Sequence, residues 1–231
     1  MQAMILAAGR GERMRPLTND TPKPLLKVAG KSLIERTIEQ LVLAGFTDLV
    51  INYAYLGEQI EAELKDGSQF GATIRYSPEG KNGLETAGGI IHALPLMNDS
   101  PFLVVNGDIA TNFPFAELKK KPVDLAHLIL VPNPEHHPKG DFWLCDTGKI
   151  HSTSPHKEDI SKSENVHTFS GIGIYSTEFF KSAPQKTTKL APLLRAAMSD
   201  NRITGQLFNG FWMDIGTPER LAILENHLSL F

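Results

Sequence analysis

The chain has 231 residues, of which 41% are hydrophobic and 21% are charged, and its net charge at pH 7 is -3. A chain of this length can bury a full core, and the composition is typical of a globular protein. The small net charge and the lack of a lysine-rich or arginine-rich tract argue against nucleic acid as a partner. The one cysteine, Cys145, excludes an internal disulfide framework and a multi-cysteine zinc site.

The N-terminal segment does not have the pattern of a signal peptide, because glycine and charge arrive as early as Gly9 and Arg10. No apolar run in the sequence is long enough to span a membrane. We therefore expect a cytoplasmic protein that has no membrane partner.

Short apolar runs alternate with segments of helical period along the first half of the chain. The expected strands are residues 3–8, 48–52, 73–76 and 102–105, and the expected helices are residues 32–44, 56–64 and 86–94. This βαβ alternation predicts an α/β, Rossmann-like fold with a mixed, mainly parallel sheet and helices on both faces. Ligands of such sheets bind at the carboxyl ends of the strands, so functional residues are expected directly after strands.

The alternation changes beyond about residue 124. Strands are expected at residues 125–131 and 169–175, and helices at residues 190–198 and from residue 218 onward. The material between the two strands is rich in proline, histidine and serine, which is typical of an insertion on the substrate side. One domain with an elaborated second half is the simplest account.

A glycine-rich stretch follows the first expected strand. The run GRGERM (residues 9–14) begins like a dinucleotide fingerprint, but Met14 takes the third glycine position, and no lysine followed by Ser or Thr completes a Walker loop. Glycines after a strand let backbone N–H groups approach an anion, and Arg13 and Arg15 add positive charge. A polyphosphate ligand fits these features, while a glycine-rich turn with solvated arginines is the alternative that the loop alone leaves open.

A lysine between two prolines favours the phosphate interpretation. In TPKPL (residues 21–25), Lys23 is flanked by residues that fix the backbone. A rigid backbone reduces the entropy cost of presenting one ammonium group in one place. We therefore expect Lys23 to contact a phosphate.

Two aspartates follow apolar stretches far apart in the sequence. Asp108 ends the run LVVNGD (residues 103–108), and Asp214 stands in FWMDIGTPERL (residues 211–221) before a helix opened by Thr217 and Pro218. Each could also be a turn or helix-entry residue. If both reach one crevice, their oxygens together with substrate phosphates form a site suited to Mg²⁺.

Five segments in this order resemble those of the sugar-phosphate nucleotidyltransferases and span nearly the whole chain: LAAGRGERMRPLT, TPKPL, LETAGG, NGD and WMDIGTPERL. The resemblance implies the GT-A-like nucleotidyltransferase fold and a single domain over residues 1–231. It further implies that residues 1–124 bind the nucleotide, that residues 125–231 bind the sugar phosphate, and that Mg²⁺ is the cofactor.

The resemblance also implies roles for individual residues. Arg13, Lys23 and Asp108 would be catalytic, with Arg13 on the outer phosphates and Lys23 on the reacting phosphates, and Asp108 and Asp214 would bind the metal. The residues implied at the nucleotide are Ala8, Gly9, Gly11, Arg13, Lys23, Glu85, Thr86, Ala87, Gly88 and Asn106.

Gly140, Ser170 and Gly171 are the residues implied at the sugar phosphate. Many relatives carry a Glu-Lys-Pro motif whose lysine grips this phosphate, and the segment SKSENVHTFSG (residues 161–171) lacks it. This departure leaves Lys162, Lys157 or no residue as the replacement.

The segments GFTDLVIN, DGSQFGATIRYSPEG, HHPKGDF and LAPLLRAAM, with the short length, resemble the members of the family that act in peptidoglycan recycling. The substrates that this narrower resemblance implies are UTP and N-acetylmuramate 1-phosphate. The sugar-phosphate oxygen would attack the α-phosphorus in line, without a general base, because it is already an oxyanion. A monomer or a small homo-oligomer is expected.

Other functions stay open at this point. Mannose-1-phosphate guanylyltransferase or glucose-1-phosphate thymidylyltransferase activity would need only another pocket shape, and a non-catalytic nucleotide-sugar sensor would need none of the chemistry. The pair His136 and His137 could suggest a transition-metal site, but the histidine spacing follows no metal motif. A loop that borders the sugar pocket is the preferred interpretation of this pair.

Overall fold

The central strand of the sheet buries both of its faces. In the computed structural model, which describes residues 1–98, 100–152, 165–181, 183 and 187–229, β1 (Ala3–Leu6) directs Ala3 and Ile5 into one apolar cluster and Met4 into another. Strand side chains alternate between the two faces, so a strand with helices on both sides needs apolar residues at every position. The sequence AMIL meets this requirement.

The strands of the first half form a parallel sheet. β1 pairs in parallel with β4 and with β6, and β4 pairs in parallel with β5. Their carboxyl ends therefore share one edge of the sheet, where the site lies. The bounds are β4 (Asp48–Tyr53), β5 (Thr73–Pro78) and β6 (Phe102–Asn106).

The strands of the second half continue the same sheet beyond β6. β11 runs antiparallel to both β6 and β8, β12 pairs in parallel with β8, and β9 joins the start of β11 to β10. The sheet is therefore mixed and mainly parallel in its first half, as predicted. The bounds are β8 (Ala126–Val131), β9 (Phe142–Leu144), β10 (Ile150–His151), β11 (Val166–Tyr175) and β12 (Ile203–Leu207).

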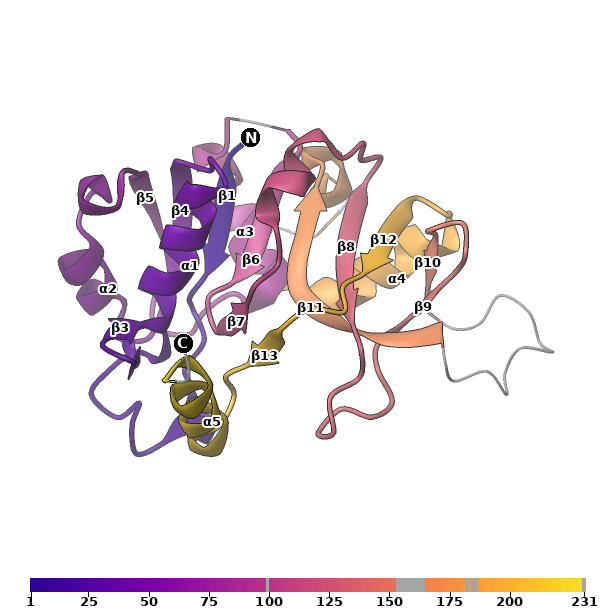
Figure 1. The fold of residues 1–231 in the computed structure, drawn as a ribbon. Helices are drawn as coiled ribbons and strands as arrows, with labels where there is room; N and C mark the ends of the chain where they lie inside the picture. The colour runs from indigo at the N-terminus through magenta and orange to yellow at the C-terminus, as the bar shows by residue number, and fades with distance from the viewer. Residues whose placement is uncertain (99, 153–164, 182, 184–186, 230–231) are drawn as a thin grey trace.

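Helices cover both faces of the sheet (Figure 1). α1 (Leu33–Leu43) and α2 (Gly57–Leu64) pack into the cluster that contains Ile5, whereas α3 (Glu85–Ala93) and α4 (Leu190–Ser199) pack into the cluster that contains Met4. The α1 boundary follows from a capping box, in which the Ser32 hydroxyl accepts from the Glu35 N–H and the Glu35 carboxylate accepts from the Ser32 N–H. None of the helices in the described part of the chain is long and apolar enough to cross a membrane.

Two small ribbons lie outside the main sheet. β2 (Lys27–Val28) pairs with β3 (Lys31–Ser32), and β7 (Ile109–Thr111) pairs with β13 (Trp212–Asp214), directly before α5 (Pro218–Leu228). A third apolar cluster, which includes Met14, Ile215 and Leu224, packs α5 against the first turn of the chain. The short 3₁₀ helices formed by the described residues are η1 (Glu12–Met14), η2 (Lys23–Leu25), η3 (Ser68–Phe70), η4 (Leu94–Leu96), η5 (Phe115–Lys120) and η8 (Thr177–Phe180).

The structure contains every helix and strand expected from periodicity and adds several that periodicity does not indicate. The expected strand at residues 3–8 ends at Leu6, and the strand expected at residues 169–175 begins three residues earlier, at Val166. β2, β3, β7, β9, β10, β12 and β13 were not predicted. Apart from β12, these strands have only two or three residues, which is too short for an alternating pattern to be recognised.

His127, on the doubly buried strand β8, makes stability depend on pH. Its side chain is 2% exposed and contacts Thr204 and Gln206, and burial, assisted by the charge of Lys121, lowers its pKa to about 4. The unfolded chain, with a histidine pKa of about 6.5, binds more protons between these two values, so stability is full above about pH 6.5 and falls toward pH 4. We expect the wild type to lose about 2 kcal/mol between pH 7 and pH 5 that His127→Gln does not lose.

Urea unfolding of both proteins at the two pH values measures this difference. An equal loss in the two proteins would contradict a neutral His127 in the folded state.

Candidate active site

A cavity of about 360 Å³ opens at the carboxyl ends of the four parallel strands. Asn52 at the end of β4 and the residues that directly follow β1, β5 and β6 contribute to its lining, as the parallel arrangement predicts. Its lining comprises Leu6, Ala7, Ala8, Gly9, Lys23, Pro24, Asn52, Glu79, Asn82, Gly83, Leu84, Glu85, Thr86, Asn106, Gly107, Asp108 and Thr187.

The glycine loop after β1 is shaped by a left-handed backbone at Gly11. Gly11 has φ +63°, and a Cβ there would lie 2.9 Å from Thr18 Cγ2. The Gly11 carbonyl accepts from the Thr18 hydroxyl and from the Met14 N–H, both at 2.8 Å, which starts η1. Gly9 has no atom within 4 Å of a built Cβ, so this side of the loop is open for a ligand.

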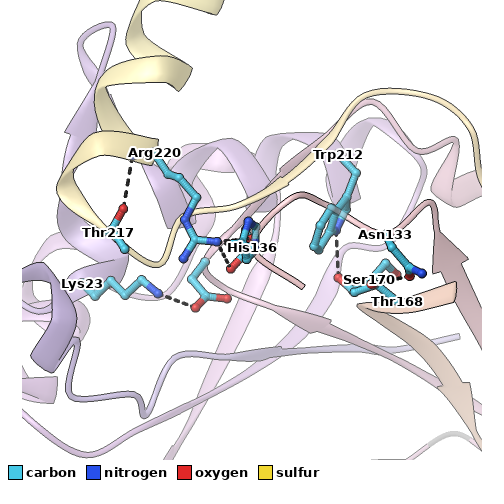
Figure 2. Close-up of polar contacts among 10 residues, drawn as sticks. Lys23, Asn133, His136, Thr168, Ser170, Trp212, Thr217 and Arg220 are labelled. Atoms are coloured by element: carbon cyan, nitrogen blue, oxygen red, sulfur yellow. Dashed lines mark hydrogen bonds and ion pairs between the residues drawn. The ribbon is translucent and has the colours of Figure 1, made fainter. Parts of the chain in front are cut away.

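Lys23 is held at the cavity wall by its neighbours and by an ion pair. It begins η2 between Pro22 and Pro24, and only 8% of the residue is exposed. Its Nζ lies 2.5 Å from Asp108 Oδ2, and Figure 2 shows the side chain extended toward this contact. The proline frame therefore presents one ammonium group at one place.

Asp108 is fixed by a close approach of two backbones. The Gly107 N–H donates to the Leu6 carbonyl at 2.8 Å, and a Cβ on Gly107 would lie 2.8 Å from that same oxygen. A residue with a side chain does not fit there, because the atom in its way belongs to the backbone of β1. Gly107 thus ties Asp108 to the glycine loop.

The ribbon of β7 and β13 brings the second aspartate beside the first. Asp214 stands opposite Ile109 in this ribbon, and the Ile215 N–H donates to the Asp108 carbonyl at 2.8 Å. The two carboxylates therefore come from adjacent backbone segments. Asp108 lines the cavity, and Asp214 lies next to it in the adjoining ribbon. Carboxylate oxygens are the donors that Mg²⁺ prefers, so the residues present fit this ion.

Asp214 contacts an arginine and a histidine in this structure. Arg220 Nη1 donates to both carboxylate oxygens, at 2.6 and 2.7 Å, and His136 Nε2 lies 2.9 Å from Oδ1. His136 Nε2 also lies 2.6 Å from Arg220 Nη1, and Figure 2 shows the two side chains together. Arg13 lies close by, because a Cβ on Gly216 would be 3.1 Å from one of its guanidinium nitrogens.

The cavity wall contains a polar network that the sequence did not reveal. Asn52 Oδ1 accepts from the Ala7 N–H at 2.9 Å, and Asn52 Nδ2 donates to Glu79 Oε1 at 2.5 Å. Glu79 Oε2 accepts from the Leu84 N–H at 2.7 Å, and burial raises the pKa of Glu79. Asn52 lies at the end of β4 and Glu79 directly follows β5, so these positions at strand ends were the signal that could have identified them.

The segment LETAGG is only partly exposed to the cavity. Glu85 and Thr86 line it, and Glu85 has φ +62°, a conformation that costs a residue with a side chain about 1–2 kcal/mol. Ala87 and Gly88 are buried in α3, and the Gly88 N–H donates to the Thr188 carbonyl at 3.0 Å. Of the four residues in this segment that were expected at the nucleotide, Glu85 and Thr86 therefore line the cavity, whereas Ala87 and Gly88 pack beneath it.

A second cavity, of about 440 Å³, continues from the first. The two share Glu85, Thr86 and Asn106, so the two cavities are contiguous. The remaining lining is Asp141, Phe142, Phe169, Lys189, Leu190, Ala191 and Leu194. Lys189 and Phe169 were not singled out from the sequence.

The three residues expected at the sugar phosphate lie beside this second cavity rather than in its lining. Gly140, with φ +61°, precedes Asp141, and a Cβ there would lie 2.6 Å from the Asn133 side chain. The Ser170 hydroxyl is committed to the bulge of β11, because it donates to the Ile129 carbonyl and accepts from the Ile172 N–H. Gly171 leaves room for Asn106, since a Cβ would lie 2.5 Å from its amide nitrogen.

Each residue of the His136–His137 pair contacts an aspartate. His136 contacts Asp214, and His137 Nε2 lies 3.1 Å from Asp141 Oδ1. Within the described residues, no group of three or more His, Cys, Asp or Glu side chains is arranged to hold a metal ion. Lys157 and Lys162, the candidate replacements for the missing motif lysine, lie outside the described residues.

The nucleotidyl transferase family model matches residues 2–229. The chain belongs to the nucleotidyl transferase family. Its relatives in that family include the N-acetylmuramate α-1-phosphate uridylyltransferase of Neisseria meningitidis, to which it is 51% identical over 96% of this chain and 95% of that protein. The corresponding enzyme of Caulobacter vibrioides is 33% identical, over 98% of this chain and 96% of that protein.

More distant similarities extend to a further curated protein and to solved structures. Mannose-1-phosphate guanyltransferase β-B of Xenopus laevis is 32% identical over 95% of this chain, which spans 62% of that protein. A candidate glucose-1-phosphate thymidylyltransferase from Bacillus anthracis superposes with a TM-score of 0.80 at 19% identity, covering 98% of this chain and 94% of that one. This structural likeness confirms the predicted nucleotidyltransferase fold.

Proposed function

We propose that the protein transfers a uridylyl group from UTP to N-acetylmuramate 1-phosphate, giving UDP-N-acetylmuramate and pyrophosphate. The observation that carries the proposal is the meeting of the Lys23–Asp108 pair with Asp214 beside an open glycine loop. The choice of substrates is supported by the 51% identity to the Neisseria enzyme over nearly the full length of both chains.

The two cavities suggest where each substrate binds. We assign the nucleotide to the first cavity, formed by residues 1–124 together with Thr187, and the sugar phosphate to the second, formed mainly by residues 125–231 of the same domain. Asn52 and Glu79 line the first cavity, where we assign them as hydrogen-bonding partners for a nucleobase.

The chain's own residues supply orientation and charge. Backbone N–H groups at Ala8, Gly9 and Gly11 face the phosphates, Arg13 binds the outer phosphates, and Lys23 binds the reacting ones. The sugar-phosphate oxygen forms a bond to the α-phosphorus while the bond from that phosphorus to the bridging oxygen breaks, and pyrophosphate leaves with the electron pair. No side chain must remove a proton, because the nucleophile is already an anion.

Asp108 and Asp214 are the residues that would hold Mg²⁺. When bound, this ion supplies electrostatic stabilisation of the charge on the transferred phosphoryl group. Asn106 lies beside Asp108 at the junction of the two cavities, where it can orient the nucleotide against the acceptor.

Pyrophosphate release tests the proposal. UTP, dTTP, GTP and CTP are each combined with the 1-phosphates of N-acetylmuramate, N-acetylglucosamine, glucose and mannose, with Mg²⁺ present and with Asp108→Asn as the inactive control. We expect release with UTP and N-acetylmuramate 1-phosphate and at least about tenfold less with other pairs. A different preferred pair would replace the substrates, and nucleotide binding without release from any pair would indicate a sensor.

A further inference from the structure

Each carboxylate of the proposed metal site is paired with its own cation in this structure. Lys23 Nζ lies 2.5 Å from Asp108 Oδ2, and Arg220 Nη1 lies 2.6 and 2.7 Å from the two oxygens of Asp214. A divalent cation that binds both carboxylates therefore competes with two side-chain cations. Lys23 already has a place at the phosphates, whereas Arg220 has no role so far.

The position of Arg220 in α5 is unfavourable for an arginine. Thr217 caps this helix, because its hydroxyl accepts from the Arg220 N–H, so Arg220 stands at the third helical position. A glutamate is favoured at this position, where it completes a capping box, and a positive charge is disfavoured near a helix N-terminus. The helix itself does not account for the arginine, but the pair with Asp214 does.

A second guanidinium group lies beside Arg220. A Cβ built on Gly216 would lie 2.2 Å from Arg220 Nη2 and 3.1 Å from Arg13 Nη2, so both groups border the same small space. Two like charges at such a place repel each other unless an anion is near. Asp214 supplies that anion in this structure, and a phosphate group suits the planar, multiply donating guanidinium groups equally well.

We propose that Arg220 is an exchangeable counter-ion. In the metal-free protein Arg220 neutralises Asp214. When a divalent cation binds Asp214, the Arg220 side chain turns to the pyrophosphate group beside Arg13. The inference rests on the proposed function, because that function places Asp214 at the metal and Arg13 at the outer phosphates. Its consequence is that divalent cation and pyrophosphate each strengthen the binding of the other, since each takes one partner of the same ion pair.

Calorimetric titration of the full chain with Mn²⁺, and with pyrophosphate at saturating Mn²⁺, tests the exchange in Arg220→Met. Loss of the competing cation is expected to tighten Mn²⁺ binding in the absence of pyrophosphate about threefold or more. Loss of a charge-assisted contact is expected to weaken pyrophosphate binding by about tenfold. Arg202→Met is the matched control, because Arg202 pairs with Asp124 and Glu178 instead, and neither affinity should change in it.

Gly216→Ala provides a second variant that keeps every charge. The added methyl group occupies the place of Arg220 Nη2 and must displace this flexible end, so the same tightening of Mn²⁺ binding is expected. If Arg220→Met binds Mn²⁺ and pyrophosphate as the wild type does, or binds both more weakly by the same factor, the exchange is overturned. It is also overturned if the wild type binds neither Mn²⁺ nor pyrophosphate. These titrations contain no UTP or sugar phosphate, so a failure of the exchange is separate from a failure of the proposed activity, which turnover of the wild type measures.

Discussion

Asp108→Asn is expected to lower kcat by at least about 100-fold, because an amide cannot replace the charge of the carboxylate that we propose as a metal ligand, and a metal there would stabilise the transition state by several kcal/mol. The fixed backbone around Asp108 keeps another residue from moving into its place. Its backbone is fixed by Gly107 against β1 and by the Ile215 N–H. Steady-state pyrophosphate release measures the loss.

A cost in stability accompanies this substitution and must be separated from the loss of activity. Lys23 is only 8% exposed and would lose its anionic partner, so we expect the free energy of unfolding to fall by about 1–3 kcal/mol. Assays well below the midpoint of thermal unfolding keep the variant folded. Asp200→Asn, which changes an exposed carboxylate at the end of α4, is the matched control. Wild-type turnover in folded Asp108→Asn would contradict the assignment.

Lys23→Met is expected to lower kcat by about 10²–10³-fold, the usual cost of removing one preorganised group that stabilises developing charge. Methionine fills much of the volume of the lysine stem between Pro22 and Pro24 and leaves no unpaired ammonium group in the wall. Asp108, with 37% of its side chain exposed, can be solvated when it loses its partner. The variant should therefore unfold at close to the wild-type temperature.

Single-turnover rates at saturating UTP test whether the loss in Lys23→Met belongs to the chemical step. The control is Lys27→Met, which removes a nearby exposed lysine on β2. A normal single-turnover rate with a raised KM would mean that Lys23 binds the ground state alone, and would contradict a role at the reacting phosphates.

Local features of the sequence were sufficient to predict the frame of the site. The run from Ala3 to Leu6 is apolar at each position because helices cover both faces of β1, and this pattern is visible in the sequence itself. Gly11 and Lys23 were likewise predictable, since a left-handed turn requires glycine and two prolines fix the residue between them.

The positions of residues that depend on distant pairing were less predictable. Ala87 and Gly88 were expected at the nucleotide, and helical periodicity turns both into the core beneath the cavity. Asn52 and Glu79 line the cavity although neither belongs to a glycine or aspartate motif. The only local feature that marks each of them is its position at the end of a strand. That position does not show which side chain at the end of another strand it will contact.

The sequence by itself determined the fold class, the glycine loop and the separate residues of the candidate site, because periodicity, glycine and proline act within a few residues. Only the tertiary structure decided that Asp214 lies beside Asp108 through the ribbon of β7 and β13. It also decided that Arg220 and His136 contact the Asp214 carboxylate. The physical reason is that short strands and ion pairs between distant residues carry no periodic signal. They form when burial of the whole sheet and of α5 brings their backbones together.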